Sequence, residues 1–314
     1  MVVEESHNLR STIFMEDYLE RLDRPEMTYY REVYKNSKRW TGEPLAGKTL
    51  IIYCEQGLGD TIQFARFFKL IEDANIILHA PKALHRLLLS DETCMWGCID
   101  KDCEELPAHD YHVLSMSLPF ILKDKKPSIP YFTVPPYNLG KEFEGTKKIG
   151  ICWEGNPEHP RNMERSCPLR LFRGLEQPDR KFFMIHKEIQ TPELTSGAEG
   201  MDLSSIPIED LWDTARLISA MDVIISVDTA ALHLAGAMGK LTFGLLDKDY
   251  DYRWRVRNWY PTIALLFQGK QGDWITVFAG LMMLVDTILS GTKQKEPVEL
   301  TTMIGESFLS PDKA

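Results

Sequence analysis

The stretch 226–239, which reads SVDTAALHLAGAMG, constrains the fold of this chain more than any other segment. An apolar run at 222–226 leads into it, and a second apolar run at 241–246 follows it. Both runs are typical of strands that are buried on both faces in a parallel sheet. Because the residues between them have helical spacing, the pattern predicts a strand, a helix and a second parallel strand.

Three polar residues occupy the predicted junction between strand and helix. Asp228 and Thr229 lie where the strand ends, and His233 lies about one turn inside the helix. A helix start presents unpaired N–H groups and the positive end of a dipole, and open α/β sheets bind ligands at this edge. The arrangement predicts an anion site that fits a diphosphate. A structural interpretation stays open, because Asp and Thr are good helix N-caps and a lone histidine is often structural.

A second junction of the same kind lies earlier in the chain. The sequence predicts a strand at 49–54, then a glycine-rich turn and a helix. Gly57 and Gly59 let the backbone approach a bound group closely, and Asp60 stands at the helix start beside them. Because Ile62 occupies the third glycine position, this turn is not the dinucleotide-binding fingerprint.

The segment 42–49, GEPLAGKT, matches the phosphate-loop pattern letter for letter. That loop functions only between a preceding strand and a following helix. Here a charged helical pattern comes first, and Lys48 and Thr49 run straight into a strand. We therefore reject an ATPase or GTPase function.

Metal binding is a second possibility that the spacing disfavours. Cys94, Cys98 and Cys103, followed by His109 and His112, match no established zinc-ligand pattern, so we expect no metal site. The six cysteines are also too sparse for a disulfide scaffold and indicate a reducing compartment.

Composition narrows the class of protein. The 314 residues suffice for two domains, and 44% hydrophobic with 26% charged residues is typical of a soluble globular protein. No apolar run is long enough to span a bilayer and the N-terminus is acidic, so we expect a cytoplasmic protein. The net charge of −10 disfavours general affinity for nucleic acid. The segment 251–257 mixes cations and aromatics as a single-strand groove does, but a loop beside a ligand site explains it better.

Strand and helix patterns alternate in two series along the chain. A proline-rich stretch at 127–136 fits neither a central strand nor a helix and leads into a linker. We expect an α/β fold with two doubly wound, Rossmann-like domains facing a cleft. The expected parts are a helical extension at 1–40, a first domain at 41–143, a second domain at 144–290 and a tail at 291–314.

Several collinear segments carry a family resemblance. They are WTGEPLAGKTL at 40–50, CEQGLGDTIQFAR at 54–66, GNPEH at 155–159 with ERSCPL at 164–169, VDTAALHLAG at 227–236 and GDW at 272–274. Together they resemble the heptosyltransferase-like glycosyltransferase domain, of GT-B type, that is often found at the C-terminus of bacterial tetratricopeptide-repeat proteins. The match covers most of residues 40–285. The repeat array itself is absent from this sequence, and only the helical segment at 12–39 resembles the stretch that precedes the domain.

The resemblance implies roles for the polar residues at both junctions. Asp60 matches the base that activates the acceptor hydroxyl in that family. Asp228, Thr229, Ala230 and His233 match the motif that holds the donor diphosphate. The family binds its nucleotide sugar mainly through the second domain and has no metal requirement or other cofactor.

Further site residues follow from the same resemblance. Arg165 is the basic residue expected to face the phosphates, and Asn156 from the same segment is a further donor-side candidate. The acceptor-side candidates do not come from the resemblance. They are Gln63, together with Ser115 and Ser117 at the end of a predicted strand in the first domain.

Two positions depart from the family pattern. Heptosyltransferases usually carry glycine after the Asp-Thr pair, where this chain has Ala230, so the donor sugar cannot be carried over. Many relatives have an acid three residues before the Arg-Ser pair, where this chain has Asn162. Either Glu164 substitutes for that acid or the position has no role.

We therefore expect an inverting, metal-independent glycosyltransferase that moves a sugar from a nucleotide-diphosphate sugar to a hydroxyl of a glycan, protein or small molecule. Two alternatives stay open. One is a catalytically silent nucleotide- or glycan-binding module of the same fold. The other is a transferase acting on modified DNA bases, which the acidic composition disfavours. The sequence does not reveal the sugar, the nucleotide base or the acceptor.

Overall fold

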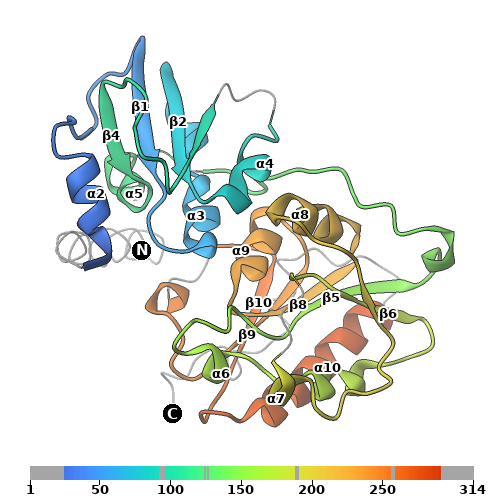
Figure 1. The fold of residues 1–314 in the computed structure, drawn as a ribbon. Helices are drawn as coiled ribbons and strands as arrows, with labels where there is room; N and C mark the ends of the chain where they lie inside the picture. The colour runs from blue at the N-terminus through green and yellow to red at the C-terminus, as the bar shows by residue number, and fades with distance from the viewer. Residues whose placement is uncertain are drawn as a thin grey trace, which may run out of the picture. The chain divides into compact units, whose positions relative to one another are not determined.

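The protein forms two compact α/β units, each built on a parallel sheet (Figure 1). The computed structural model describes residues 25–91, 96–123, 125, 127–187, 191–255 and 259–290. Unit 1 runs to Phe132 and unit 2 starts at Thr133. Residues just after this division bond within unit 2, since Ser219 Oγ donates to the Val134 carbonyl at 3.2 Å. The domain boundary predicted at 143 lies further along the chain.

Unit 1 has a four-stranded sheet in the order β3-β2-β1-β4, and all its pairings are parallel. The strands are β1 (Lys48–Tyr53), β2 (Ala74–Ala80), β3 (Gly97–Asp100) and β4 (Tyr111–Leu114). The helices are α2 (Thr28–Val33), α3 (Leu58–Ala65), α4 (His85–Leu88) and α5 (Leu118–Ile121), with 3-10 turns η1 (Pro25–Met27), η2 (Phe68–Leu70), η3 (Lys82–Leu84) and η4 (Ser115–Ser117). After β1 the chain adds β2 and β3 on one side of that strand and then β4 on its other side.

The face of the unit 1 sheet that carries Ile51 and Tyr53 is covered by the N-terminal helix α2. Tyr30 of this helix and its C-cap residue Tyr34 pack on those two side chains in one buried cluster. Of the helical extension predicted at 1–40, the structure describes the part from residue 25. The part before it lies outside the described residues, as does the predicted tail from 291.

Unit 2 has a six-stranded parallel sheet in the order β10-β9-β8-β5-β6-β7. The strands are β5 (Lys147–Cys152), β6 (Arg180–Met184), β7 (Leu203–Ser205), β8 (Val223–Val227), β9 (Thr242–Leu246) and β10 (Ile263–Phe267). The helices are α6 (Asn162–Arg165), α7 (Pro192–Thr195), α8 (Leu211–Ala220), α9 (Ala230–Ala237) and α10 (Trp274–Ser290), with 3-10 turns η5 (Lys141–Phe143), η6 (Leu169–Leu175) and η7 (Tyr252–Arg255). Numbered from β5, this is the doubly wound 3-2-1-4-5-6 order.

Helices cover both faces of the unit 2 sheet, with α8 and α9 on one face and α10 on the other (Figure 1). Alternate strand residues such as Ile149 and Val227 pack with α10 in one buried core. On the opposite face Gly244 leaves room for Leu232 of α9, because an added Cβ would lie only 3.2 Å from that side chain. The strands are therefore buried on both sides, as their continuous apolar runs predict.

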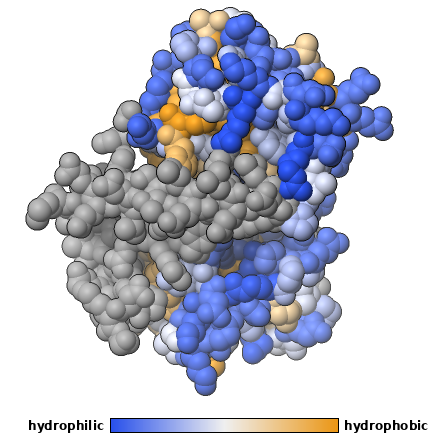
Figure 2. Space-filling model, turned by 90° about the vertical axis from the view of Figure 1, so that its left-hand side faces the viewer, coloured by the Kyte–Doolittle hydropathy of each residue, from blue (hydrophilic) through white to orange (hydrophobic). Residues whose placement is uncertain are grey.

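The predicted fold class is confirmed, because both sheets are parallel α/β sheets with helical crossovers. The structure describes no helix long and apolar enough to cross a membrane within the ranges given above. On the face drawn in Figure 2 the described side chains are mostly hydrophilic.

Candidate functional site

The topological switch point of unit 2 lies between β5 and β8, where the chain changes the direction in which it winds. Ligands of open α/β sheets bind at the carboxyl ends of the strands at such a point. Glu154 and Gly155 follow β5 there, and Asp228 and Thr229 follow β8. The structure thus brings the segment that contains Arg165 to the same edge as the opening motif.

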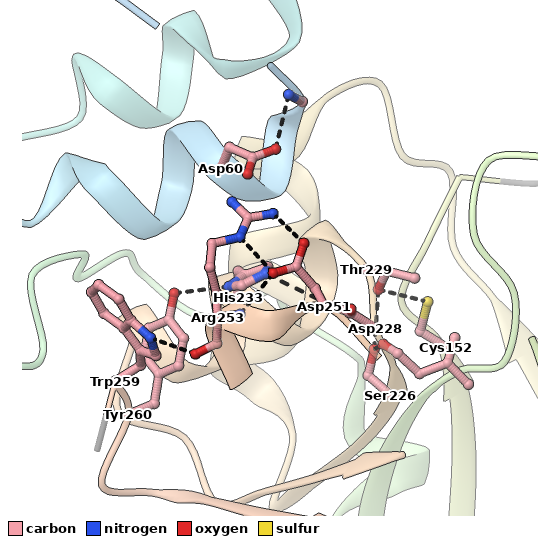
Figure 3. Close-up of polar contacts among 12 residues, drawn as sticks. Asp60, Cys152, Ser226, Asp228, Thr229, His233, Asp251, Arg253, Trp259 and Tyr260 are labelled. Carbon is pink, nitrogen blue, oxygen red and sulfur yellow. Dashed lines mark hydrogen bonds and ion pairs between the residues drawn. The ribbon is translucent and has the colours of Figure 1, made fainter. Parts of the chain in front are cut away.

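Thr229 is the N-cap residue of α9, but its side chain does not cap the helix. Its hydroxyl contacts Ser226 Oγ at 3.1 Å and Cys152 Sγ at 3.4 Å instead (Figure 3). The side chain is therefore tied to the ends of β8 and β5. The first N–H groups of α9 do not bond to it, and such groups bind anions readily.

His233 is buried, and other side chains of unit 2 surround its ring (Figure 3). Its Nδ1 lies 3.0 Å from the Tyr260 hydroxyl, and its Nε2 lies 3.9 Å from Asp228 Oδ1. Trp254 stacks on the ring with 4.9 Å between centroids. Neither aromatic residue was among the predicted site residues, although both lie in or next to the aromatic and basic segment that the sequence singles out.

Asp251 and Arg253 form a two-bond ion pair beside this histidine. Arg253 Nε donates to Asp251 Oδ1 at 2.8 Å, and a terminal nitrogen donates to Oδ2 at 2.9 Å. Burial acts to raise the pKa of Asp251, but these bonds and the charges of Arg253 and His233 hold it below its ordinary value. The segment predicted as a loop beside the ligand site therefore supplies charges to it.

Asp228 carries the most informative electrostatic signal at this edge. Burial raises its pKa to about 6 from an ordinary 3.8, and the negative charge of Asp251 adds to the rise. A hydrogen bond from Trp254 and the charges of Arg165 and Arg253 oppose it. A carboxyl group with such a pKa is half protonated near pH 6, and when protonated it donates a hydrogen bond to an anion.

Asp228 should cost the folded protein stability at neutral pH. In the unfolded chain it loses its proton near pH 4, whereas the folded chain keeps it to about pH 6. Unfolding therefore becomes easier as the pH rises through this interval. We expect Asp228→Asn to raise the free energy of unfolding by about 1–3 kcal/mol at pH 7.5 and to change little below about pH 4. Urea denaturation at both pH values measures this, with Asp179→Asn as an exposed control. A loss of stability at pH 7.5 would contradict the assignment.

Arg165 lies over the turn that follows β5. A Cβ added to Gly155 would lie 2.5 Å from its terminal nitrogen, so only glycine permits this position. Nothing among the described residues accepts a hydrogen bond from the buried Arg165 Nε. Burial lowers the pKa of Arg165, and the negative charge of Asp228 opposes this. A buried Nε without a hydrogen-bonding partner is costly, which makes Arg165 a candidate contact for an anion.

Asn162 supports this turn. Its Oδ1 accepts hydrogen bonds from Gly155 N–H and Ser166 Oγ, both at 3.1 Å. An amide thus fixes the turn at the position where the family resemblance predicts an acid. Glu164 is exposed and pairs with Arg161 at 2.8 Å.

Asn156, a donor-side candidate from the sequence, is exposed. Its Oδ1 accepts a hydrogen bond from Glu158 N–H at 3.1 Å, so the side chain also shapes its own turn. Two carboxylates that the sequence reasoning missed follow the strands on either side of β8. Glu154 after β5 accepts from Thr191 N–H at 3.2 Å, and Asp247 after β9 pairs with Arg161.

The switch point of unit 1 lies between β1 and β4, which are followed by the glycine turn and by η4. Gly57 is the N-cap residue of α3, and its N–H donates to Asp60 Oδ2 at 3.0 Å (Figure 3). Gly59 lies within the first helical turn. The left-handed residue of the turn is Gln56, with φ of 65°. Asp60 is half-buried at this edge of the sheet, as the sequence predicts.

The acceptor-side candidates lie on α3 and η4, which are in contact. Ser115 Oγ donates to the buried Glu55 at 2.9 Å. Ser117 Oγ and both amide atoms of Gln63 are buried and have no hydrogen-bonding partner among the described residues. Buried polar atoms of this kind mark candidate ligand contacts or ordered water.

The cysteines and histidines considered for zinc do not form a metal site among the described residues, where no group of three possible ligands is arranged for one. Cys94 lies outside those residues. Cys103 Sγ lies 3.5 Å from His79 Nε2, while His109 and His112 contact Ser37.

Comparison with known proteins gives a relative and several structural neighbours. No family model matches the chain. It is 24% identical over 280 residues to Protein FlbA from Caulobacter vibrioides, which covers 75% of this chain and 46% of FlbA. The chain thus spans less than half the length of that relative.

Several structural neighbours are glycosyltransferases. The family 9 glycosyl transferase from Veillonella parvula has a TM-score of 0.53 at 11% identity and covers 86% of this chain and 99% of its own. The ADP-heptose heptosyltransferase II of E. coli has a TM-score of 0.51 at 10% identity, and the match covers 76% of this chain and 99% of that enzyme. The iron-containing heptosyltransferase TibC from enterotoxigenic E. coli was solved with ADP-D-β-D-heptose. It has a TM-score of 0.52 at 11% identity, and the match covers 74% of this chain and 66% of TibC. The chain therefore has the GT-B fold of these enzymes.

Proposed function

We propose that this protein is a glycosyltransferase that uses a nucleotide-diphosphate sugar. The observation that carries the proposal is the Arg165 side chain at the switch point of unit 2, whose buried Nε has no hydrogen-bonding partner among the described residues and whose charge acts on Asp228 just before α9. A diphosphate supplies the oxygens that this Nε and the start of α9 lack. The glycosyltransferases of the same fold support the transfer of a sugar rather than binding alone.

In the proposed reaction the sugar moves in one displacement. Asp60 takes the proton of the acceptor hydroxyl, and the resulting oxygen attacks the anomeric carbon. The bond between that carbon and the diphosphate oxygen breaks, and the nucleoside diphosphate leaves with the electron pair. Arg165, the start of α9 and a protonated Asp228 or His233 stabilise the charge on the departing group.

The proposal assigns the two halves of the reaction to the two units. Thr229 and Ala230 present the helix start to the donor, and Asn156 borders it from the turn after β5. Gln63, Ser115 and Ser117 offer hydrogen bonds to an acceptor with several hydroxyl groups. The proposed acceptors are glycans, proteins or small molecules. The acidic composition disfavours nucleic acid as an acceptor.

The proposal further states that the reaction inverts the anomeric centre of the sugar and needs no metal ion. Each of these two statements has its own test. A single displacement inverts the anomeric centre, so the anomeric configuration of the product tests the first. Arg165 and the helix start supply positive charge at the diphosphate, which is the role that a divalent cation serves elsewhere. Because one structural neighbour contains iron, turnover with and without a chelator tests the second.

His233 distinguishes recognition of phosphate from support of the fold. We expect His233→Ala to weaken nucleoside diphosphate binding by about tenfold to a hundredfold, because a charge-assisted hydrogen bond is worth roughly 1.5–3 kcal/mol. Nucleoside binding should change far less, because a nucleoside has no phosphate for the imidazole to contact. Calorimetry with nucleoside, monophosphate and diphosphate measures the series. Equal losses for all three would show that His233 only supports the fold.

The experiment that tests the proposed function follows nucleotide release from a panel of nucleotide sugars in the presence of glycan, protein and hydroxymethylated-DNA acceptors. Release that depends on one sugar and one acceptor is the expected result. Tight binding without release for any combination would favour a silent binding module, and release only with DNA would favour the modified-base alternative.

A further inference from the structure

The peptide group between Gln56 and Gly57 is bonded at both ends. Lys101 Nζ donates to the Gln56 carbonyl oxygen at 2.9 Å, and the Gly57 N–H of the same peptide donates to Asp60 Oδ2 at 3.0 Å. The two bonds place a cation at the oxygen end of the peptide dipole and the Asp60 carboxylate at its N–H end.

This arrangement fixes a turn that the chain does not favour by itself. Gln56 has φ of 65°, a left-handed conformation that residues other than glycine rarely adopt without support. The Lys101 ammonium also lies 5.4 Å from the centre of the Tyr53 ring, which holds its stem over the end of β1. On the other side, Gly57 permits the close approach of Asp60, because an added Cβ would lie 3.2 Å from Oδ2.

Lys101 is also coupled electrostatically to this edge. Burial lowers its pKa, against the opposing effects of Cys54, Glu55, Asp60 and Asp102. A hydrogen bond to a charged group is stronger than a neutral one, and bonds in a chain strengthen one another in a low-dielectric setting. The ammonium therefore strengthens the bond between the Gly57 N–H and the carboxylate.

We propose that Lys101 is a positioning residue that acts through the Gln56–Gly57 peptide to hold Asp60 in the orientation of a base. The inference rests on the proposed function for its catalytic consequence. We call the hydrogen-bonded arrangement of Lys101, the Gln56–Gly57 peptide and Asp60 the clamp, and it can be measured without an activity assay. Nothing in the local sequence signals it, because Lys101 reaches the turn from the end of β3, two strands away from β1.

The test compares Lys101→Met, which removes the charge, with Lys101→Arg, which keeps it. Lys48→Met is the matched control, because Lys48 lies in the same unit at the opposite end of β1 and pairs with Asp110. In the full-length protein we expect Lys101→Met to speed hydrogen exchange at the Gly57 amide by about tenfold or more. It should lower kcat by about tenfold to a hundredfold and leave the donor KM within about twofold. Lys101→Arg should keep most of the protection from exchange at Gly57 and most of kcat. Lys48→Met should change neither the exchange rate nor kcat.

The outcomes separate the clamp from the proposed function. Unchanged exchange at Gly57 in Lys101→Met overturns the clamp, whether or not the protein is a transferase. Faster exchange with unchanged kcat in an active enzyme overturns the positioning role. An arginine variant as impaired as the methionine variant overturns the role of the charge. If Lys101→Met does not fold, Lys101→Gln gives the same comparison, and its folding is checked first by circular dichroism.

Discussion

Replacing Asp60 with asparagine should lower turnover by roughly two to four orders of magnitude while donor affinity stays nearly unchanged. Asparagine keeps an oxygen that accepts the Gly57 N–H, so the turn and the start of α3 persist. It cannot accept the acceptor proton at neutral pH. Because the proposed base belongs to unit 1 and the proposed donor groups belong to unit 2, we expect the substitution to remove proton transfer alone.

Single-turnover rates and donor titrations of the variant measure the two quantities separately. Asp73→Asn is the matched control, since Asp73 is exposed and asparagine tolerates its left-handed φ of 59°. Wild-type turnover of Asp60→Asn, or a loss of donor affinity as large as the loss of turnover, would contradict the assignment of Asp60 as the base.

Arg165→Met should produce the second large effect, a loss of nucleoside diphosphate affinity without a loss of folding stability. Nucleoside diphosphate affinity should fall by about tenfold to a hundredfold or more, because the guanidinium makes charge-assisted hydrogen bonds to phosphate. The free energy of unfolding of the ligand-free protein should stay the same or rise. The reason is that Arg165 Nε lacks a partner among the described residues, so removing the buried cation removes a cost.

Isothermal calorimetry and urea denaturation of the same preparations test this pair of expectations. Arg173→Met is the control, because Arg173 is an exposed arginine of unit 2 that lies 3.7 Å from Glu176 and donates to the Glu199 carbonyl at 3.1 Å. A destabilised Arg165→Met with normal diphosphate affinity would show that the arginine supports the fold and does not bind phosphate.

The parallel strands could be predicted from the sequence because their signal is local. The runs around Ile51, Ile151 and Ile225 are apolar without interruption, which only burial on both faces explains. The switch-point strands β1 and β8, predicted at 49–54 and 222–226, were therefore found within one residue of their observed bounds. The short strands β3 and β7 lie at sheet edges with few buried residues, and nothing local marks them.

Helix bounds were predicted less well because capping decides them. The apolar spacing predicts a helix over 208–220, but α8 begins at Leu211, since Asp210 accepts hydrogen bonds from Trp212 and Asp213 N–H and sets the start. The pattern at 81–89 predicts one helix, whereas the structure has the 3-10 turn η3 followed by the short α4. The apolar run at Ile263–Phe267 forms β10, a strand that is not among the predicted elements.

The candidate site shows the same division between local and distant contacts. The two strand-to-helix junctions place Asp60 and Asp228 from local pattern alone, but the partners that set their chemistry come from elsewhere in the chain. Lys101 reaches the Asp60 turn from β3, and Trp254 reaches Asp228 from η7. Contacts between residues far apart in sequence leave no periodic signal, so the structure was needed to find them.

The most direct test of the central claim is calorimetric titration of the wild-type protein with ADP, UDP, GDP and CDP, beside the corresponding nucleosides and inorganic diphosphate. It needs no acceptor and no knowledge of the sugar. We predict binding of at least one nucleoside diphosphate at one site per chain, with affinity that falls at least tenfold in Arg165→Met. Failure of all four to bind, or equal binding by wild type and Arg165→Met, would contradict a diphosphate site at the switch point of unit 2.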